Sequence, residues 1–294
     1  MTLYTQSYSG EYTWRASNIG ASPGVDSAQG TACSPGSAAF VKGSITTVMA
    51  GSNIANDVHW VTVIAHNAST AASSRRVFVD IYTDPAGGSS WGVSPIIADL
   101  AFNGPALLGG TYAYGFPLYI PSGAAIGAAL AQSTGSAGAP RVTIAVAGRP
   151  MHPEYNKVGS FVRTFGSGSV AGGGSGVAIT PGAATKGSYV QVGTTAEQLW
   201  WWQAGYVSND NSQIALTHLL DIACGSTSVT AYTVVENMSF WRNSSEQGGK
   251  EIMPLTGTCF ADVASGENVF VRAASGSAGG TDTGNSVLVY AVGG

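Results

Sequence analysis

The chain has 294 residues, long enough for two ordinary domains, and 44% of them are hydrophobic. Charged residues make up only 10% and the net charge is −4, which argues against the basic surface of a nucleic-acid-binding protein. No apolar run approaches the length that spans a bilayer, and the N-terminus lacks a basic start followed by a hydrophobic stretch, so neither membrane insertion nor a conventional secretory signal is expected.

Residues 1–39 are expected to form an N-terminal arm. Stretches such as TQSYSG, GASPG and CSPGSA are rich in the residues that favour turns. An arm of this kind becomes ordered against a neighbouring subunit, which is typical of an assembly protein.

Residues 40–150 are expected to form a first β-sandwich. Short segments rich in Val, Ile, Phe and Tyr, bounded by turn residues, predict strands at WVTVIAH (60–66), VFVDIYTD (77–84) and RVTIAVAG (141–148). Windows with apolar residues at the three-and-four spacing of a helix are scarce, so the predicted fold class is all-β.

Residues 151–187 are expected to form a linker or extended arm. The stretch SGSVAGGGSGVAITPGAATKG (167–187) contains too much Gly and Ala to pack a core. Its glycine run lacks the G-K-[ST] ending of a phosphate-binding loop, so it predicts no nucleotide site, and no cofactor is expected for the chain.

Residues 188–294 are expected to form a second β-sandwich that repeats the first. Asp80 in VFVDIY matches Asp221 in HLLDIA, and the closing strands VTIAVAG (142–148) and VLVYAVG (287–293) match as well. Because the spacing between matched positions drifts by only a few residues, one architectural unit is used twice. The sequence therefore predicts two tandem antiparallel β-sandwiches of the jelly-roll-like type.

Aromatic residues supply the candidate contact sites. In the strand TAEQLWWWQAG, Trp200 and Trp202 are expected on one face and Trp201 on the other, so at least one indole lies away from the domain core. An outward indole fills a subunit interface or stacks on a sugar ring, and the thinly charged surface favours the interface. Further interface or ligand candidates come from loops expected to face outward, 102–115 and 241–251: Tyr112, Tyr114 and Trp241.

Cysteine and histidine spacing predicts neither a disulfide framework nor a metal site. Cys33, Cys224 and Cys259 are odd in number, widely spaced and form no C-x-x-C pair, so buried free thiols are expected. His59 and His66 are an odd number of positions apart on one predicted strand and point to opposite faces, which opposes a shared metal.

Acidic residues do not form a convincing catalytic pair. Asp80 and Asp221 occupy the same place in the two repeats, and the favoured interpretation is an acid on the outer face of a strand or one hydrogen-bonded to a neighbouring loop's backbone. Asp99 and Glu236 fall one register apart on aligned strands, so the repeat does not preserve the acid pair that glycoside cleavage needs. No catalytic residue is therefore assigned, and the chain is expected not to be an enzyme.

The phrase YIPSGAAIGAALAQSTGSAG, followed by VTIAVAG, resembles a pattern of bacteriophage virion structural proteins, the tail-fibre and virion-surface proteins with β-sandwich modules. In that pattern a P-x-G-x-x-I/V-x-x-R-x-Q/A-S strand precedes a loop and a V-x-V/I-x-x-Y/A-G strand. The matching positions in the two halves are Pro121, Gly123, Ile126, Gln132, Ser133 and Gly266, Val269, Arg272, Ala274, Ser275. The second half has Ala264 where the first has Pro121, and the first has Ala129 where the second has Arg272. The resemblance implies a virion context and brings no functional residues.

These observations predict a non-enzymatic structural component of a bacteriophage particle, first of all a tail or fibre protein that acts in assembly and host attachment. The alternative within the particle is a capsid decoration or head-surface protein. The chain would be made in the host cytoplasm and located in the virion, as a homo-oligomer with a trimer favoured, in contact with other virion proteins and with a host surface glycan. A competing hypothesis is a carbohydrate-binding module, which requires exposed tryptophans and an exposed pair at Tyr112 and Tyr114.

Overall fold

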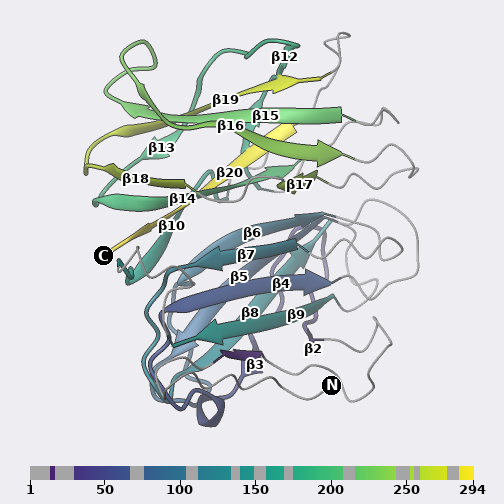
Figure 1. Ribbon diagram of the computed structural model, residues 1–294. Helices are drawn as coiled ribbons and strands as arrows, with labels where there is room; N and C mark the ends of the chain where they lie inside the picture. Colours follow the sequence, from purple (N-terminus) through teal and green to yellow (C-terminus); the bar gives the residue numbers. More distant parts are fainter. Residues whose placement is uncertain are drawn as a thin grey trace.

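The computed structural model describes residues 14–16, 30–66, 76–103, 112–133, 140–148, 157–168, 175–207, 216–242, 252–254, 259–276 and 285–294. These residues form twenty strands in four sheets, with one short helical turn at Gly51–Asn53. The four sheets pack as two sandwiches, one above the other in Figure 1. None of the described residues belongs to a helix that is long and apolar enough to cross a membrane.

The first sandwich has the strand order of a jelly roll. Its first sheet, called the β4 sheet, runs in the order β1 (Trp14–Ala16), β9 (Arg141–Ala147), β4 (Trp60–His66), β7 (Tyr112–Phe116), with β2 (Thr31–Ala32) also paired to β9. Its second sheet, the β5 sheet, runs in the order β3 (Thr46–Met49), β8 (Ala125–Gln132), β5 (Arg76–Asp84), β6 (Ile97–Asn103).

The second sandwich repeats this order. Its β14 sheet runs β10 (Phe161–Phe165), β20 (Asn285–Gly293), β14 (Leu199–Val207), β18 (Cys259–Val263), with β11 (Val177–Ile179) paired to β20. Its β15 sheet runs β12 (Gly182–Ala183), β19 (Asn268–Ser275), β15 (Leu216–Gly225), β16 (Tyr232–Arg242), β17 (Ile252–Pro254), with β13 (Val190–Thr194) paired to β19. The all-β, two-sandwich architecture predicted from the sequence is thereby confirmed.

Side-chain alternation builds the core of each sandwich. In β4, Val61, Val63 and Ala65 are buried between the sheets, whereas Trp60, Thr62 and Ile64 are half-buried on the outer face. This is the period of two that a strand imposes, with one face toward a core.

The central strands of the β14 sheet break this alternation. All nine residues of β14 are buried, and so are all nine of β20. Their inner face packs against the β15 sheet, and their outer face packs against the first sandwich, as the vertical order of the sheets in Figure 1 shows. A strand covered on both faces is mostly apolar, which explains the run LWWWQAGYV, in which Gln203 is the one buried polar amide.

The structure differs from the expected arm and linker. β1 and β2 pair with β9, and β10 and β11 pair in the same way with β20, so the described parts of residues 1–39 and 151–187 contribute strands to the sandwiches. Strands of two to five residues between glycines are too short to show a period. Residues 1–13, 17–29, 149–156 and 169–174 lie outside the described part of the chain.

The buried thiols expected from the cysteine spacing are confirmed at two positions. Cys33 and Cys224 are buried and free. Burial raises the pKa of Cys33 to about 11 and that of Cys224 to about 12, so both stay protonated at neutral pH. The side chain of Cys259 lies outside the described part of the structure.

Candidate functional site

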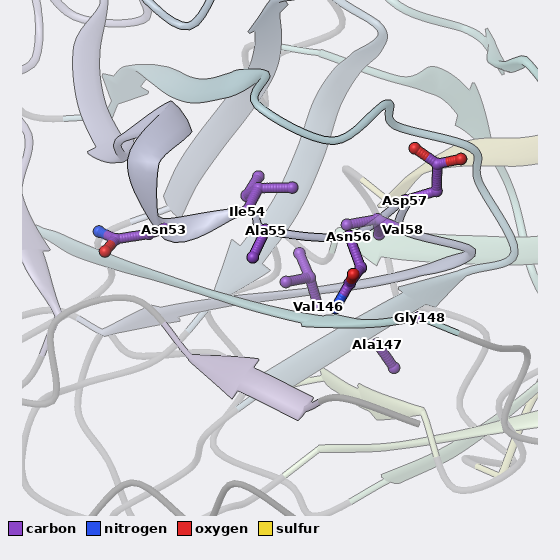
Figure 2. Close-up of a pocket in the computed structure, with 9 residues that line it drawn as sticks. All are labelled: Asn53, Ile54, Ala55, Asn56, Asp57, Val58, Val146, Ala147 and Gly148. Atoms are coloured by element: carbon purple, nitrogen blue, oxygen red, sulfur yellow. The ribbon is translucent and has the colours of Figure 1, made fainter. Parts of the chain in front are cut away.

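A shallow pocket opens at one end of the first sandwich (Figure 2). It is lined by residues 53–58 and by the end of β9 at residues 146–148. Asp57 accepts a hydrogen bond from the Ser122 backbone N–H at 2.8 Å, and Tyr119, 44% exposed, lies nearby with its ring centroid 5.9 Å from that of His59. His59 Nδ1 in turn contacts the carbonyl oxygen of Gly148. The pocket itself is thus lined by amide, carboxylate and small apolar groups, and the exposed ring of Tyr119 lies outside this lining.

The two sandwiches contact each other through a surface that contains both apolar packing and polar interactions. The outer face of the β14 sheet covers the edge of the first sandwich that β6 and β7 form (Figure 1). One apolar cluster runs through both sandwiches, because Trp201, Leu288, Tyr290 and Val292 join the core of the first. The two sandwiches therefore share a core.

The three consecutive tryptophans lie on both sides of this sheet. Trp201 packs edge-on against Trp60 of the first sandwich, with centroids 5.3 Å apart, and against Phe260 at 4.5 Å. Trp200 also belongs to the shared cluster and stacks on Phe260 at 6.4 Å. Trp202 faces the core of the second sandwich and donates its indole N–H to the Ala261 carbonyl at 2.8 Å.

This arrangement corrects the expected alternation, in which Trp200 shares a face with Trp202. The strand pairing of β14 shifts register between Leu199 and Trp201, and such a bulge lets two consecutive side chains lie on one side of the sheet. The covered surface is also an interface within one chain, whereas the sequence pointed to an interface between subunits or to a sugar.

Two tyrosines bind backbone groups of β6, Tyr290 from the second sandwich and Tyr114 from within the first. Tyr290 donates its hydroxyl to the Asp99 carbonyl at 2.8 Å and accepts the Ala101 N–H at 3.0 Å. Tyr114 donates to the Ala101 carbonyl at 2.7 Å, and burial raises the pKa of both tyrosines, which keeps these hydroxyls protonated. Gly205 lies beneath both hydroxyls, because a Cβ there would meet the Tyr290 oxygen at 2.8 Å.

The aromatic candidates from the sequence are thus largely interior. Trp200, Trp201, Trp202 and Tyr114 are all buried, so they do not meet the exposure that a carbohydrate-binding module requires of them. The backbones of Tyr112 and Trp241 lie in β7 and β16, and their side chains are outside the described part of the structure.

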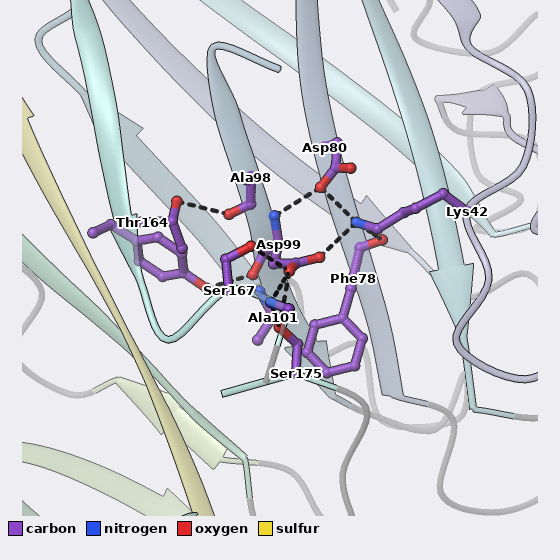
Figure 3. A network of polar contacts seen from close by, with 11 residues as sticks. Lys42, Phe78, Asp80, Ala98, Asp99, Ala101, Thr164, Ser167 and Ser175 are labelled. Atoms are coloured by element: carbon purple, nitrogen blue, oxygen red, sulfur yellow. Dashed lines mark hydrogen bonds and ion pairs between the residues drawn. The ribbon is translucent and has the colours of Figure 1, made fainter. Parts of the chain in front are cut away.

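A polar network crosses the same interface at Asp99 (Figure 3). Lys42 Nζ lies 2.5 Å from Asp80 Oδ1 and 2.8 Å from Asp99 Oδ1. The other oxygen of Asp99 accepts hydrogen bonds from the hydroxyls of Ser167 and Ser175, both at 2.8 Å, and from the Gly168 N–H. These three donors belong to the segment between β10 and β11, so one carboxylate of the first sandwich holds the second.

The second sandwich contains the corresponding aspartate without this second acid. Asp221 lies 2.6 Å from Lys186 Nζ and 2.9 Å from Arg272 Nε, and it accepts the Asn237 N–H at 2.9 Å, as Asp80 accepts the Asp99 N–H at 2.8 Å. Asp99 and Asn237 both have positive φ, 53° and 55°. The sequence favoured an acid on the outer face of a strand or one hydrogen-bonded to a neighbouring loop's backbone. In the structure each aspartate accepts a hydrogen bond from the backbone of a neighbouring strand, β6 or β16.

Nothing in the sequence pattern predicts that Asp80 and Asp99 share one lysine. The sequence comparison sets Asp99 beside Glu236, one register apart. In the structure, the bulged strands make Asn237 the residue of the second sandwich that is equivalent to Asp99. The sequence does contain a signal for this equivalence: Phe102 in IIADLAF matches Phe240 in VVENMSF, and the same spacing matches Asp99 with Asn237.

The two carboxylates on Lys42 have pKa values displaced in opposite directions. Burial raises the pKa of Asp80 and outweighs the opposing effects of Lys42 and of the Asp99 N–H. Burial acts on Asp99 in the same direction, but Lys42 and the hydroxyls of Ser167 and Ser175 outweigh it and hold the pKa of Asp99 below its ordinary value. Asp99 is therefore the ionised acceptor that binds the second sandwich.

Asp99→Asn is expected to flatten the acid side of the stability profile. A carboxylate with a lowered folded-state pKa contributes stability above its unfolded pKa, about 3.9 for Asp, and loses it as the pH falls through the folded value. Asparagine cannot titrate, so the variant is less stable at neutral pH and its free energy of unfolding changes less below about pH 4. Urea unfolding across the acid range measures this, and a profile parallel to that of the wild type would contradict it.

The described residues contain no group of three or more His, Cys, Asp or Glu side chains that could hold a metal ion.

The chain matches no protein-family model and no curated protein. It is similar to solved structures at low identity. PNGF-II is 10% identical with a TM-score of 0.37, and the match covers 97% of this chain and 65% of that one, so this chain spans under two thirds of its length. A peptide-N(4)-(N-acetyl-β-D-glucosaminyl)asparagine amidase is 11% identical over 96% of both chains, with a TM-score of 0.34. Empty particles of cowpea mosaic virus are 10% identical over 92% of this chain and 93% of theirs, with a TM-score of 0.27.

The prediction that the chain is not an enzyme is contradicted by the amidase, whose match covers 96% of both chains, and it is withdrawn. Scores at this level carry no residue, substrate or activity from the amidase to this chain. What the findings support is coarser: two β-sandwiches consistent with a binding or structural role.

Proposed function

We propose that the chain is a structural component of a bacteriophage particle in which each copy acts as one rigid pair of jelly rolls. The observation that carries the proposal is the shared core: every residue of β14 and β20 is buried, one face against the β15 sheet and the other against the first sandwich. A pair fixed in this way presents an invariant surface to its neighbours, as the subunit of a large assembly requires. The low content of charged residues, 10%, suits a surface that contacts other protein.

A position in the tail or a fibre, with a role in assembly and host attachment, is the first candidate. It is supported by the resemblance of the strand and closing-strand phrase around residues 118–148 to virion proteins of that kind. A head-surface position is the second candidate, and the jelly-roll strand order favours it, since viral capsid domains use this order.

The partners proposed are further copies of the chain, with a trimer favoured, and other virion proteins. A host surface glycan is a further proposed partner. Among the described residues, the pocket beside Tyr119 offers the exposed ring and the polar groups that a sugar needs.

Immunogold labelling of particles made by the phage that encodes the chain tests this function. Gold at the tail supports the first candidate and gold on the head surface supports the second. Intact particles that carry no label, with the chain detected only in the soluble lysate, would overturn the proposal.

A further inference from the structure

The contact within the chain joins two different surfaces, an edge and a face. The edge consists of β6 and β7 of the first sandwich, and the face is the outer side of β14 and β20. Because the second sandwich repeats the strand order of the first, each surface occurs twice. The second edge is formed by β16 and β18, and β17 pairs with the end of β16 at residues 240–242 but not with the part around Glu236. The second face is the outer side of β4 and β9.

The second face matches the covered one position by position. Trp60 pairs with Ala147 as Trp201 pairs with Val292, and Thr62 pairs with Ala145 as Gln203 pairs with Tyr290. Ala145 therefore lies where Tyr290 lies in the covered face. Trp60, at one end of this second face, already packs against Trp201 of the same chain. The rest of the face is uncharged and half-buried at Thr62, Ile64 and Ala145.

The second edge carries the same bulge as the covered one. Asn237 has the positive φ of Asp99, yet Asn237 and its neighbour Glu236 are exposed, whereas Asp99 is 8% exposed beneath the second sandwich. At the covered edge, backbone groups around Asp99 receive the hydroxyls of Tyr290 and Thr164. Within the described residues, the chain thus holds one joined edge and face, and a second edge and face that its own sandwiches do not join, apart from the contact of Trp60 with Trp201.

We infer that copies of this chain associate head to tail, with the face around Ala145 of one copy on the edge around Glu236 of the next. This rests on the proposed function, of which it names the contact between copies, and it continues the interface already present in the chain. A contact between unlike surfaces closes into a ring, such as a trimer, or extends as a filament, and it excludes a two-fold dimer. It is weaker than the contact within the chain, because Ala145 replaces Tyr290 and Asn237 replaces Asp99.

Ala145→Arg tests the face. The variant places a long cationic side chain at its centre, where burial without a partner is unfavourable. Light scattering across a dilution series is expected to show wild-type oligomers, and the concentration at which half the variant assembles should rise by more than about tenfold. Thr217→Arg is the matched control, since Thr217 is an exposed strand residue on the outer face of the β15 sheet, away from both surfaces. Unchanged thermal unfolding of both variants shows that they fold.

Crosslinking tests the pairing of unlike surfaces. Ala145→Cys and Glu236→Cys chains, treated with a short bis-maleimide, should form crosslinked dimers when mixed and not when either variant is treated alone, with wild type as the control for native cysteines. Ala145→Cys crosslinked to itself would indicate a two-fold dimer and overturn the inference. A wild type that stays monomeric at every concentration would also overturn the inference. The same holds for an oligomer whose assembly is unchanged by Ala145→Arg and that gives no mixed crosslink. Each of these outcomes leaves the proposed function standing, because only particles without gold label overturn that.

Discussion

Trp201→Ala is expected to lower the free energy of unfolding by about 3–5 kcal/mol, the usual cost of removing a large aromatic side chain from a core. Trp201 is buried between the sandwiches, edge-on to Trp60 at 5.3 Å and to Phe260 at 4.5 Å. Its loss opens a cavity in the cluster that both sandwiches share, so the interface weakens together with the core. Chemical unfolding followed by circular dichroism measures the loss.

Trp201→Phe is the matched variant for this position. The indole Nε1 of Trp201 is buried and has no hydrogen-bond partner among the described residues, so phenylalanine removes an unsatisfied donor while keeping an aromatic ring. The loss should be clearly smaller than for alanine. Equal losses for the two variants, or a loss below about 1 kcal/mol for alanine, would show that the indole does not join the sandwiches.

Asp221→Ala is expected to cost about 3–5 kcal/mol, the range for removing one partner of a buried ion pair. The Asp221 side chain is 1% exposed and binds Lys186, Arg272 and the Asn237 N–H. Burial alone would raise its pKa, but these three donors outweigh burial and hold the pKa of Asp221 below its ordinary value. Removing the carboxylate leaves two cations facing each other across the outer side of the β15 sheet. Urea unfolding at neutral pH measures the difference.

Asp262→Ala is the control for this experiment. Asp262 pairs with Lys157 at 2.6 Å, but both side chains are 58% exposed, and an exposed pair is worth about 0–1 kcal/mol. A similar loss in the two variants would mean that the Asp221 contacts add nothing beyond an ordinary surface pair.

The long strands were predictable from the sequence because they carry their own signal. The expected strand at 60–66 coincides with β4, and those at 77–84 and 141–148 differ from β5 and β9 by one residue at one end. Each consists of apolar, β-branched or aromatic residues between turn residues, and that pattern needs no knowledge of the rest of the chain. Strands such as β11 and β12 hold two or three residues, and only their pairing with β20 and β19 makes them strands.

The site depended on information that the sequence does not carry locally. The triple tryptophan marked a contact surface, but the partner of Trp201 in the first sandwich is Trp60, which the sequence assigned to a core. Tyr290 binds backbone groups of β6, and backbone groups have no residue signature. The role of Asp99 depends on a bulge that turns its side chain toward Lys42, Ser167 and Ser175. All three contact residues are distant from Asp99 in the chain. Strict alternation, the rule used to place these side chains, fails wherever a strand bulges.

Because the first sandwich is synthesised before the second, the edge that the second sandwich covers is exposed during synthesis. The last strand of the first sandwich, β9, ends at Ala147, but the strands that cover β6 and β7 end only at Gly293. A nascent first sandwich therefore exposes an open strand edge and the apolar ring of Trp60 for as long as the second half is being made, and such an edge recruits other chains into aggregates. Truncation after the first sandwich should give insoluble protein, and full-length chain should depend on chaperones that bind between the two stages.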